Sequence, residues 1–332
     1  MESEPGRGSI GHVRYTSSPV GIMTRHMALS FPNLRPDIFT IPALHLGSFT
    51  LGPFPLRWYG LAYIAGILAG WRYALNLAGN AKLWRGAGPP ATAAQIDDLI
   101  LWLTLGVVVG GRIGYICFYM LPLADGRATL AADPLDVFRV WQGGMSFHGG
   151  MLGVTVAMLA FASRRRLPLL GLADLVAACV PIGLFFGRIA NFINGELWGR
   201  TTNLPWGMIF CGPHIATAAD GSCVAGLQPR HPSQLYEAGL EGIVLFLILR
   251  LATHRGGWLG RRGAVTGLFL LCYGTFRISL ENVRMPDAGL QDLPFGLTVG
   301  MMLSAPMVLA GAYLIWRGMR MPDEAANVPS QP

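Results

Sequence analysis

Long apolar stretches separated by short polar segments make up most of the chain. Seven of them stay apolar over the roughly 20 residues that a helix needs to cross the hydrocarbon layer of a membrane. The pattern therefore predicts an all-α polytopic membrane protein with about seven transmembrane helices. We place these helices near residues 56–77, 96–120, 144–163, 171–190, 235–251, 264–282 and 295–316.

The two ends of the chain lack this apolar pattern. Residues 1–55 are polar and contain Pro and Gly, so we expect an N-terminal tail that is partly disordered, with Met27 as an alternative translation start. Residues 317–332 form a C-terminal tail. The transmembrane domain between them, residues 56–316, contains one long loop, 191–234, between the fourth and fifth predicted helices.

Composition supports a membrane protein. Hydrophobic residues make up 52% of the chain and charged residues 13%, whereas soluble proteins average about 25% charged residues. Glycine pairs four residues apart, such as Gly106/Gly110 and Gly149/Gly153, lie on one helix face and let a neighbouring backbone pack closely. The net charge of +7 does not indicate nucleic-acid binding, because the basic residues are distributed over the loops.

The basic residues predict the orientation in the membrane. Lys and Arg are frequent in the loops after the first, third and fifth predicted helices and in the C-terminal tail, and sparse in the other loops. By the positive-inside rule the basic loops and the C-terminus are cytoplasmic, and the N-terminus is outside. Four arginines within residues 1–35 oppose this assignment, and a start at Met27 would remove three of them.

Polar and ionisable side chains collect at the predicted outer ends of the helices. Such groups are unfavourable in a membrane, so their collection at one depth predicts a functional site facing the outer leaflet. Arg277 and Glu281 are four residues apart on one helix face and can pair. Arg188 and Arg277 suit a phosphate, because a guanidinium donates two parallel hydrogen bonds. The whole set is Arg57, Tyr59, His148, Arg188, Asn191, Glu196, His231, Glu237, Tyr273, Arg277 and Glu281.

Several of these residues, and Arg112 in the second predicted helix, also have a purely structural interpretation. Arg277 and Glu281 could be a structural pair joining helices, and His231 could belong to the turn before Pro232. His148, among glycines, could bond the backbone at a helix end, and Arg188 could extend to the membrane surface. Tyr59 could belong to an interfacial aromatic belt. Glu237 could stabilise a helix N-terminus, and Arg112 could pair with a carboxylate inside the bundle.

Cysteine spacing indicates no metal site. Cys117, Cys179 and Cys272 lie in apolar stretches, where they act as packing residues. Cys211 and Cys223 share the loop 191–234 and could form a disulfide if that loop lies outside the cytoplasm. Because no CxxC, HExxH or other metal-ligand spacing occurs, we predict neither a metal nor a cofactor.

The segment GRIANFINGELWGR, residues 187–200, closely resembles a motif of the prolipoprotein diacylglyceryl transferase family. Ala190 stands where the family pattern usually has Gly. Further segments resemble the family in the same order, from about Leu56 to Trp316. They are RWYGLAY at 57–63, HGGMLG at 148–153, RHPSQLYEA at 230–238 and the spacing of Tyr273, Arg277 and Glu281.

The resemblance implies a transferase of the bacterial cytoplasmic membrane. Such enzymes move the diacylglyceryl group of phosphatidylglycerol to the thiol of the lipobox cysteine of prolipoproteins, and glycerol phosphate leaves. It also implies that the loop 191–234 forms part of a small extracytoplasmic head. The site residues it implies are Tyr59, His148, Arg188, Asn191, Glu196, Gly199, Glu237, Tyr273, Arg277 and Glu281.

Within that reaction we expect His148 to act as the base that accepts the thiol proton. Arg188 and Arg277 would stabilise the charge of the phosphate, and Glu281 would orient Arg277. Alternatively, the arginines alone activate the thiol and His148 is structural. A phospholipid transporter or flippase is the alternative function. It would usually carry internal repeats and charges near the membrane midplane, and the sequence shows neither.

Overall fold

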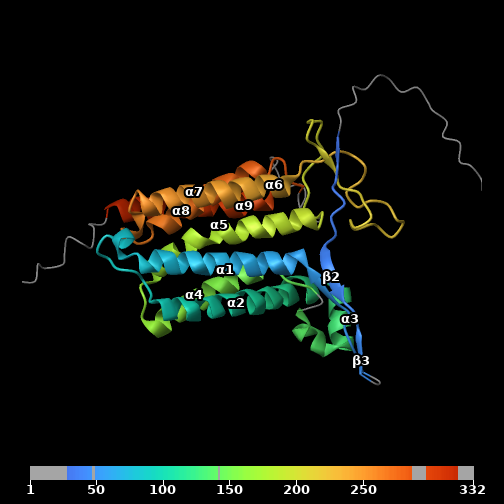
Figure 1. The fold of residues 1–332 in the computed structure, drawn as a ribbon, viewed down its shortest axis with the longest axis horizontal. Helices are drawn as coiled ribbons and strands as arrows, with labels where there is room; N and C mark the ends of the chain where they lie inside the picture. Colours follow the sequence, from blue (N-terminus) through green and yellow to red (C-terminus); the bar gives the residue numbers. More distant parts are fainter. Residues whose placement is uncertain (1–27, 47–48, 141–142, 286–296, 321–332) are drawn as a thin grey trace, which may run out of the picture.

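The computed structural model describes residues 28–46, 49–140, 143–285 and 297–320. They form a bundle of long helices with short strands at one end (Figure 1). Residues 1–27, including Met27, and 321–332, most of the predicted C-terminal tail, lie outside the described residues.

Each of the seven apolar stretches is helical. The fifth is one continuous helical segment that changes from α to π geometry and back. The helices are α1 (Trp58–Gly79), α2 (Ala93–Tyr115) with the π-helix η2 (Ile116–Met120), α4 (Phe147–Arg165), α5 (Leu169–Ile193), α6 (Ser233–Glu237) with the π-helix η5 (Ala238–Val244) and α7 (Leu245–His254), α8 (Ala264–Leu280) and α9 (Val299–Arg320).

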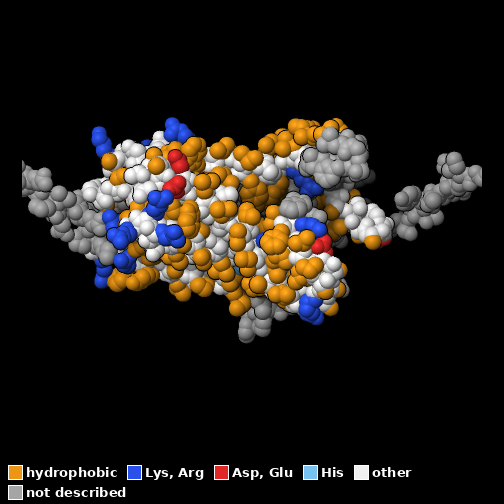
Figure 2. Space-filling view, turned by 90° about the horizontal axis from the view of Figure 1, so that it is seen from below, with side chains coloured by type: hydrophobic (Ala, Val, Ile, Leu, Met, Phe, Trp, Pro, Cys, Tyr) orange, Lys and Arg blue, Asp and Glu red, His pale blue; other side chains and the backbone are white. Residues whose placement is uncertain are grey.

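Three helical segments among the described residues are long and apolar enough to cross a membrane, judged by length and composition. They are Ala93–Met120, Leu169–Ile193 and Val299–Arg320. Figure 2 shows hydrophobic side chains over the middle of the molecule, with Lys and Arg towards its two ends and more of them at one end than at the other. The surface is thus divided along the helix axes into an apolar band and polar ends.

The chain crosses the bundle in alternating directions. Strands and the loop that follows α5 lie at the end where α1 begins, which we call the strand end (Figure 1). Because α2, α5 and α8 finish at this end and α4, α6 and α9 begin there, residues distant in sequence share one end of the bundle. The opposite end carries short connections with basic residues in or beside them, such as Arg166 after Arg164 and Arg165 in the last turn of α4.

The short strands were not part of the all-α prediction. Strand β1 (Leu29–Ser30) runs parallel to β6 (Met208–Ile209), β2 (Asp37–Ile41) pairs with β5 (Phe54–Arg57), and β3 (Leu44–Leu46) pairs with β4 (Phe49–Leu51). Most side chains of β1 and β2 are exposed on both faces. Such strands lack the alternation of apolar and polar residues that reveals a strand in sequence.

A small apolar core holds the loop 191–234 at the strand end. Phe31, from the segment after β1, is buried with loop residues, namely Met208, Phe210, Ile215 and Ala225. A disulfide joins Cys211 to Cys223 in the same loop, which is the pairing that the sequence left open. A further helix, α3 (Ala124–Ala132), and the 3-10 helix η3 (Pro134–Phe138) lie between α2 and α4 and were not predicted.

Asp174 fixes α8 against α5. This carboxylate, fully buried on α5, accepts hydrogen bonds from the backbone N–H groups of Gly263 and Thr266 at 2.6 and 2.7 Å. The Thr266 hydroxyl donates to it as well, at 2.7 Å. Because the first N–H groups of a helix lack partners within the helix, Asp174 caps α8 from a neighbouring helix.

Glycines bring α2 and α4 into backbone contact. A Cβ atom on Gly106 would lie 2.7 Å from the carbonyl oxygen of Gly153, and one on Gly110 would lie 2.5 Å from that of Gly149. Both distances are shorter than any normal contact, so no larger residue fits without separating the helices. The glycine pairs noted in the sequence are therefore packing contacts.

We expect Gly110→Ala to lower the free energy of unfolding by about 1–3 kcal/mol, since the added methyl must push α2 away from α4. The measurement is thermal unfolding of the purified protein in detergent. Gly79→Ala is the matched control, because a Cβ atom there would meet nothing within 4 Å. Equal stability of the two variants would contradict the packing role.

Candidate functional site

Arg188, near the end of α5, is held by two buried carboxylates. Its Nη1 lies 2.8 Å from Glu237 Oε2, and its Nη2 lies 3.2 Å from Glu241 Oε2. The Glu237 side chain is 1% exposed and that of Glu241 is 0% exposed. Glu237 ends α6 and Glu241 lies in the π-helix η5. Because buried charges need partners, these pairs fasten α5 to the fifth helical segment.

A second pair lies at the end of α8. Arg277 Nη1 is 2.7 Å from Glu281 Oε2, four residues further along, as the spacing suggested. Gly300 of α9 faces this carboxylate, and a Cβ atom there would lie 2.7 Å from Glu281 Oε2. The glycine thus lets α9 pack against the Glu281 side chain.

The two pairs belong to one electrostatic cluster. Glu241 and Tyr273 each interact electrostatically with both Arg188 and Arg277. Arg284 adds a third positive charge, with its Nη1 3.6 Å from Glu237 Oε1. Arginine and glutamate charges are therefore balanced. Both arginines that the sequence selected for a phosphate, Arg188 and Arg277, are thus paired with carboxylates.

Tyr59 and Glu196 lie beside this cluster. The side chain of Tyr59, at the start of α1, interacts electrostatically with Arg188 and Glu196. Its hydroxyl accepts a hydrogen bond from Tyr63 at 3.5 Å. Burial raises the pKa of the Glu196 carboxyl, and a hydrogen bond from Asn194 opposes that shift. Tyr59 is thus brought close to Arg188, with Glu196 on its other contact.

Asn191, one turn beyond Arg188 on α5, presents a buried acceptor. The residue is 6% exposed. Within the described part of the chain, its Oδ1 atom receives no hydrogen bond. Buried acceptors are usually paired, because leaving one unpaired is unfavourable by about 1–3 kcal/mol. Asn191 Oδ1 is therefore suited to accept a hydrogen bond from a bound molecule.

The segment after α5 is held by the start of α6. Gln234 Nε2 donates to the carbonyl oxygen of Glu196 at 2.5 Å, and Ser233 Oγ donates to that of Leu197 at 3.0 Å. Leu197 has a φ of 56°, a conformation that few residues other than glycine adopt. The buried Ser233 and Gln234 side chains therefore fix an unfavourable turn next to the site.

Gly199 joins three parts of the chain. Its N–H donates to the carbonyl oxygen of His231 at 2.9 Å, and the next N–H, of Arg200, donates to that of Val283 at 2.8 Å. The motif is thereby bonded to the segments that lead into α6 and out of α8. A Cβ atom on Gly199 would lie 2.7 Å from the Cβ of His231, so only glycine fits.

His148 stands apart from the arginine cluster. It is exposed in the first turn of α4, and its ring packs edge-on against Phe147 with the centroids 5.7 Å apart. No hydrogen bond or ion pair among the described residues joins it to Arg188 or Arg277. It shares the strand end with the cluster, because α4 begins there.

Sequence reasoning did not select four residues that build this site: Glu241, Arg284, Ser233 and Gln234. Glu241 carried a usable signal, because it is a second carboxylate in an apolar stretch, four residues after Glu237. Ser233 and Gln234 belong to RHPSQLYEA, but their acceptors lie more than 30 positions earlier in the chain. Spacing alone does not identify such partners.

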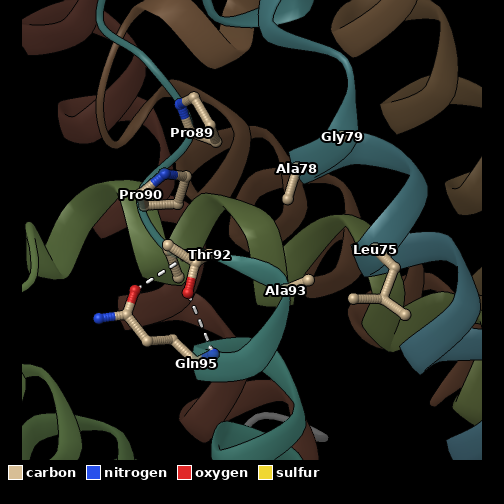
Figure 3. Close-up of a pocket in the computed structure, with 9 residues that line it drawn as sticks. Leu75, Ala78, Gly79, Pro89, Pro90, Thr92, Ala93 and Gln95 are labelled. Atoms are coloured by element: carbon tan, nitrogen blue, oxygen red, sulfur yellow. Dashed lines mark hydrogen bonds between the residues drawn. The ribbon is translucent and has the colours of Figure 1, made fainter.

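A cavity of about 370 Å³ lies away from the strand end, between the end of α1 and the start of α2 (Figure 3). Thr92 and Gln95 are its polar side chains, and they bond each other's backbone as the cap of α2. Thr92 Oγ1 and Gln95 Oε1 are thereby already bonded, and no charged side chain lines the cavity. In the described part of the chain, no three His, Cys, Asp or Glu residues gather as metal ligands would.

Residues 47–317 match the family described as prolipoprotein diacylglyceryl transferase. A protein of Caulobacter sp. (strain K31) is 58% identical over 88% of this chain and 95% of its own length. One from Caulobacter vibrioides (strain NA1000 / CB15N) is 57% identical over 90% of this chain and 99% of its own length. One from Rhizobium meliloti (strain 1021) is 49% identical over 89% of this chain and 96% of its own length. All three are named phosphatidylglycerol–prolipoprotein diacylglyceryl transferase.

We expect Gly199→Ala to disrupt the junction of the three segments, because the added methyl collides with His231. The free energy of opening this region should fall by about 1–3 kcal/mol. Hydrogen exchange measures the effect as faster exchange of the Gly199, Arg200 and His231 amides. Gly212→Ala, in the same loop, is the control, since its nearest contact would be an ordinary 3.9 Å. Unchanged protection in Gly199→Ala would refute the steric argument.

Proposed function

The chain belongs to the prolipoprotein diacylglyceryl transferase family, and we propose that it transfers the diacylglyceryl group of phosphatidylglycerol to prolipoproteins at the arginine cluster. It is a bacterial membrane protein. The observation that carries the assignment of the site is the buried cluster of Arg188, Glu237 and Glu241, at one end of a bundle whose middle is apolar.

The bundle spans the membrane seven times, with the strand end facing the outer leaflet. Seven helical segments with alternating direction support this arrangement. The basic loops at the opposite end support a cytoplasmic location for that end and for the C-terminus. The N-terminus is then outside. Residues 29–31 and the loop 191–234 form a small head there, supported by the pairing of β1 with β6 and by the core around Phe31.

Arg188 and Arg277 bind the phosphate of the lipid. A guanidinium has five N–H donors. Arg188 uses Nη1 and Nη2 on two carboxylates, which fixes its orientation and leaves further N–H groups to donate. Negative charge grows on the phosphate as glycerol phosphate leaves. Donors held in place for that charge are worth about 3–4 kcal/mol each.

Asn191, Glu196 and Tyr59 bind the glycerol headgroup. A headgroup hydroxyl donates to Asn191 Oδ1, which has no donor among the described residues. Glu196, next to Tyr59, accepts from a second hydroxyl. Gly199 keeps their segment in place, and Tyr273 lines the cluster beside Arg277.

The acceptor is the thiol of the lipobox cysteine. Its sulfur attacks the terminal glyceryl carbon of the diacylglyceryl group, the bond between that carbon and the phosphate oxygen breaks, and a thioether forms. Glycerol phosphate leaves with the electron pair of the broken bond. His148 accepts the thiol proton and passes it to the phosphate monoester. A phospholipid transporter is disfavoured, because the charges lie at one end rather than at the midplane.

The purified protein should add a diacylglyceryl mass to a synthetic lipobox peptide in the presence of phosphatidylglycerol. Arg188→Lys and Arg277→Lys should lower the rate by about 10²–10³-fold, because lysine does not reproduce the fixed donors. Peptide mass and released glycerol phosphate are measured together. Lysine is chosen because it keeps the charge that neutralises the buried glutamates.

Arg165→Lys is the matched control, since Arg165 forms an exposed pair with Asp98 at the basic end. Full rates in both test variants would remove the arginines from the reaction while keeping the function. If folded wild-type protein transfers nothing, the proposed activity is wrong.

His148→Gln should slow transfer at neutral pH, and the deficit should shrink as pH rises past about 8.5, where the peptide thiol ionises unaided. The measurement is a pH–rate profile of both proteins. His254→Gln, at the end of α7 on the basic side, serves as the control. A deficit that stays constant with pH would show that His148 does not act as the base.

A further inference from the structure

Arg112, in the last turn of α2, uses its whole guanidinium on backbone carbonyls outside its own helix. Nε donates to Val137 at 2.9 Å, and Nη1 donates to Gly143 at 2.9 Å and to Gly144 at 3.1 Å. Nη2 donates to the carbonyl oxygen of Asp136 and lies 3.3 Å from its carboxylate. The partner suggested by the sequence, a carboxylate inside the bundle, is instead a residue of η3.

These contacts shape the turn that precedes α4. Gly143 and Gly144 have φ values of 96° and 74°, which other residues rarely adopt. A Cβ atom on Gly144 would lie 2.7 Å from Arg112 Nη1. Carbonyl groups of such a turn have no partner in a helix or sheet, so Arg112 supplies their hydrogen bonds.

The turn leads directly to His148. Ser146 N–H donates to the carbonyl oxygen of Gly111 at 2.9 Å, next to Arg112. Ser146 Oγ accepts from Gly149 N–H at 3.3 Å and caps α4. His148 lies between these two bonded positions. The end of α2 therefore determines where the first turn of α4 begins and how it presents His148.

The carboxylate of Asp136 extends the network. Its Oδ1 lies 3.9 Å from Arg139 Nη1, which also pairs with Asp133. The Arg112 guanidinium lies 5.4 Å from the centre of the Tyr115 ring. The Arg112 guanidinium thus has contacts with its own helix and with η3, which leave it little freedom to move.

We propose that Arg112 is a positioning residue for the transfer: through the Gly143–Gly144 turn it directs His148 towards the acceptor thiol. This rests on the proposed function, in which His148 takes the thiol proton. Arg112 touches neither substrate. Its contribution is the placement of the base, where an error of about 1 Å is enough to slow a reaction by roughly 10²-fold.

A double-mutant cycle tests the inference on the full chain in detergent, with phosphatidylglycerol and a lipobox peptide. The variants are Arg112→Lys, His148→Gln and their combination. Lysine keeps the charge but does not reach the four carbonyls together. We expect Arg112→Lys to lower kcat by about 10²-fold with little change in the peptide KM. The double variant should be no slower than His148→Gln, because a displaced base and a missing base are equivalent.

Recovery of the Arg112→Lys rate above about pH 8.5 should parallel that of His148→Gln. Arg165→Lys, the exposed pair at the basic end, should keep the wild-type rate. If Arg112→Lys does not fold, Asp136→Asn takes its place in the cycle, since it removes one of the contacts that orient the guanidinium.

The inference would be overturned if the rate losses of Arg112→Lys and His148→Gln multiplied in the double variant and the Arg112→Lys rate did not recover at high pH. The proposed function would then still stand. A fully active His148→Gln would overturn it too, because no base would then need placing. Wild-type protein that transfers nothing would instead refute the function itself.

Discussion

The pairing of a partly buried arginine with two fully buried glutamates determines how the helices at the strand end pack. Arg188 lies near the end of a membrane helix, and its charge is balanced by two glutamates on the fifth helical segment. Glu237 and Glu241 both reach it because they are four residues apart on one face of a helical segment, which passes here from α6 into a π-helix. Single π turns inside helices are frequent at functional sites. The ion pairs thus determine how α5 and the fifth segment pack.

A site whose positive and negative charges balance attracts an anionic lipid less strongly at a distance than a patch of unpaired positive charges does. Arg188, Arg277 and Arg284 are matched by three glutamates, so the cluster exerts little net attraction at a distance. Under the proposed function, the selectivity of the cluster depends on short-range donors whose directions are already fixed. Such donors favour the geometry of a departing phosphate over a diffuse negative surface.

Helices and local pairs could be predicted from the sequence, whereas contacts between distant segments could not. Seven apolar stretches became helices because the membrane-length pattern is strong, and Arg277 pairs with Glu281 because spacing of four defines a helix face. Glu241 is 53 residues from Arg188, and no periodicity links them. The strands near Leu29 are short and exposed, so they lack a burial pattern. Whether the predicted site residues act in transfer stays a prediction.

The parallel pairing of β1 with β6 has a consequence for biosynthesis. Leu29 pairs with Met208, so β1 cannot form its hydrogen bonds until almost 180 further residues have been synthesised. Gly199 also bridges Arg284, which follows α8. Because contacts between distant segments form late, the strand end closes only after six of the seven helices have left the ribosome. A nascent chain therefore contains six of its seven long helices before the contacts that complete the strand end can form.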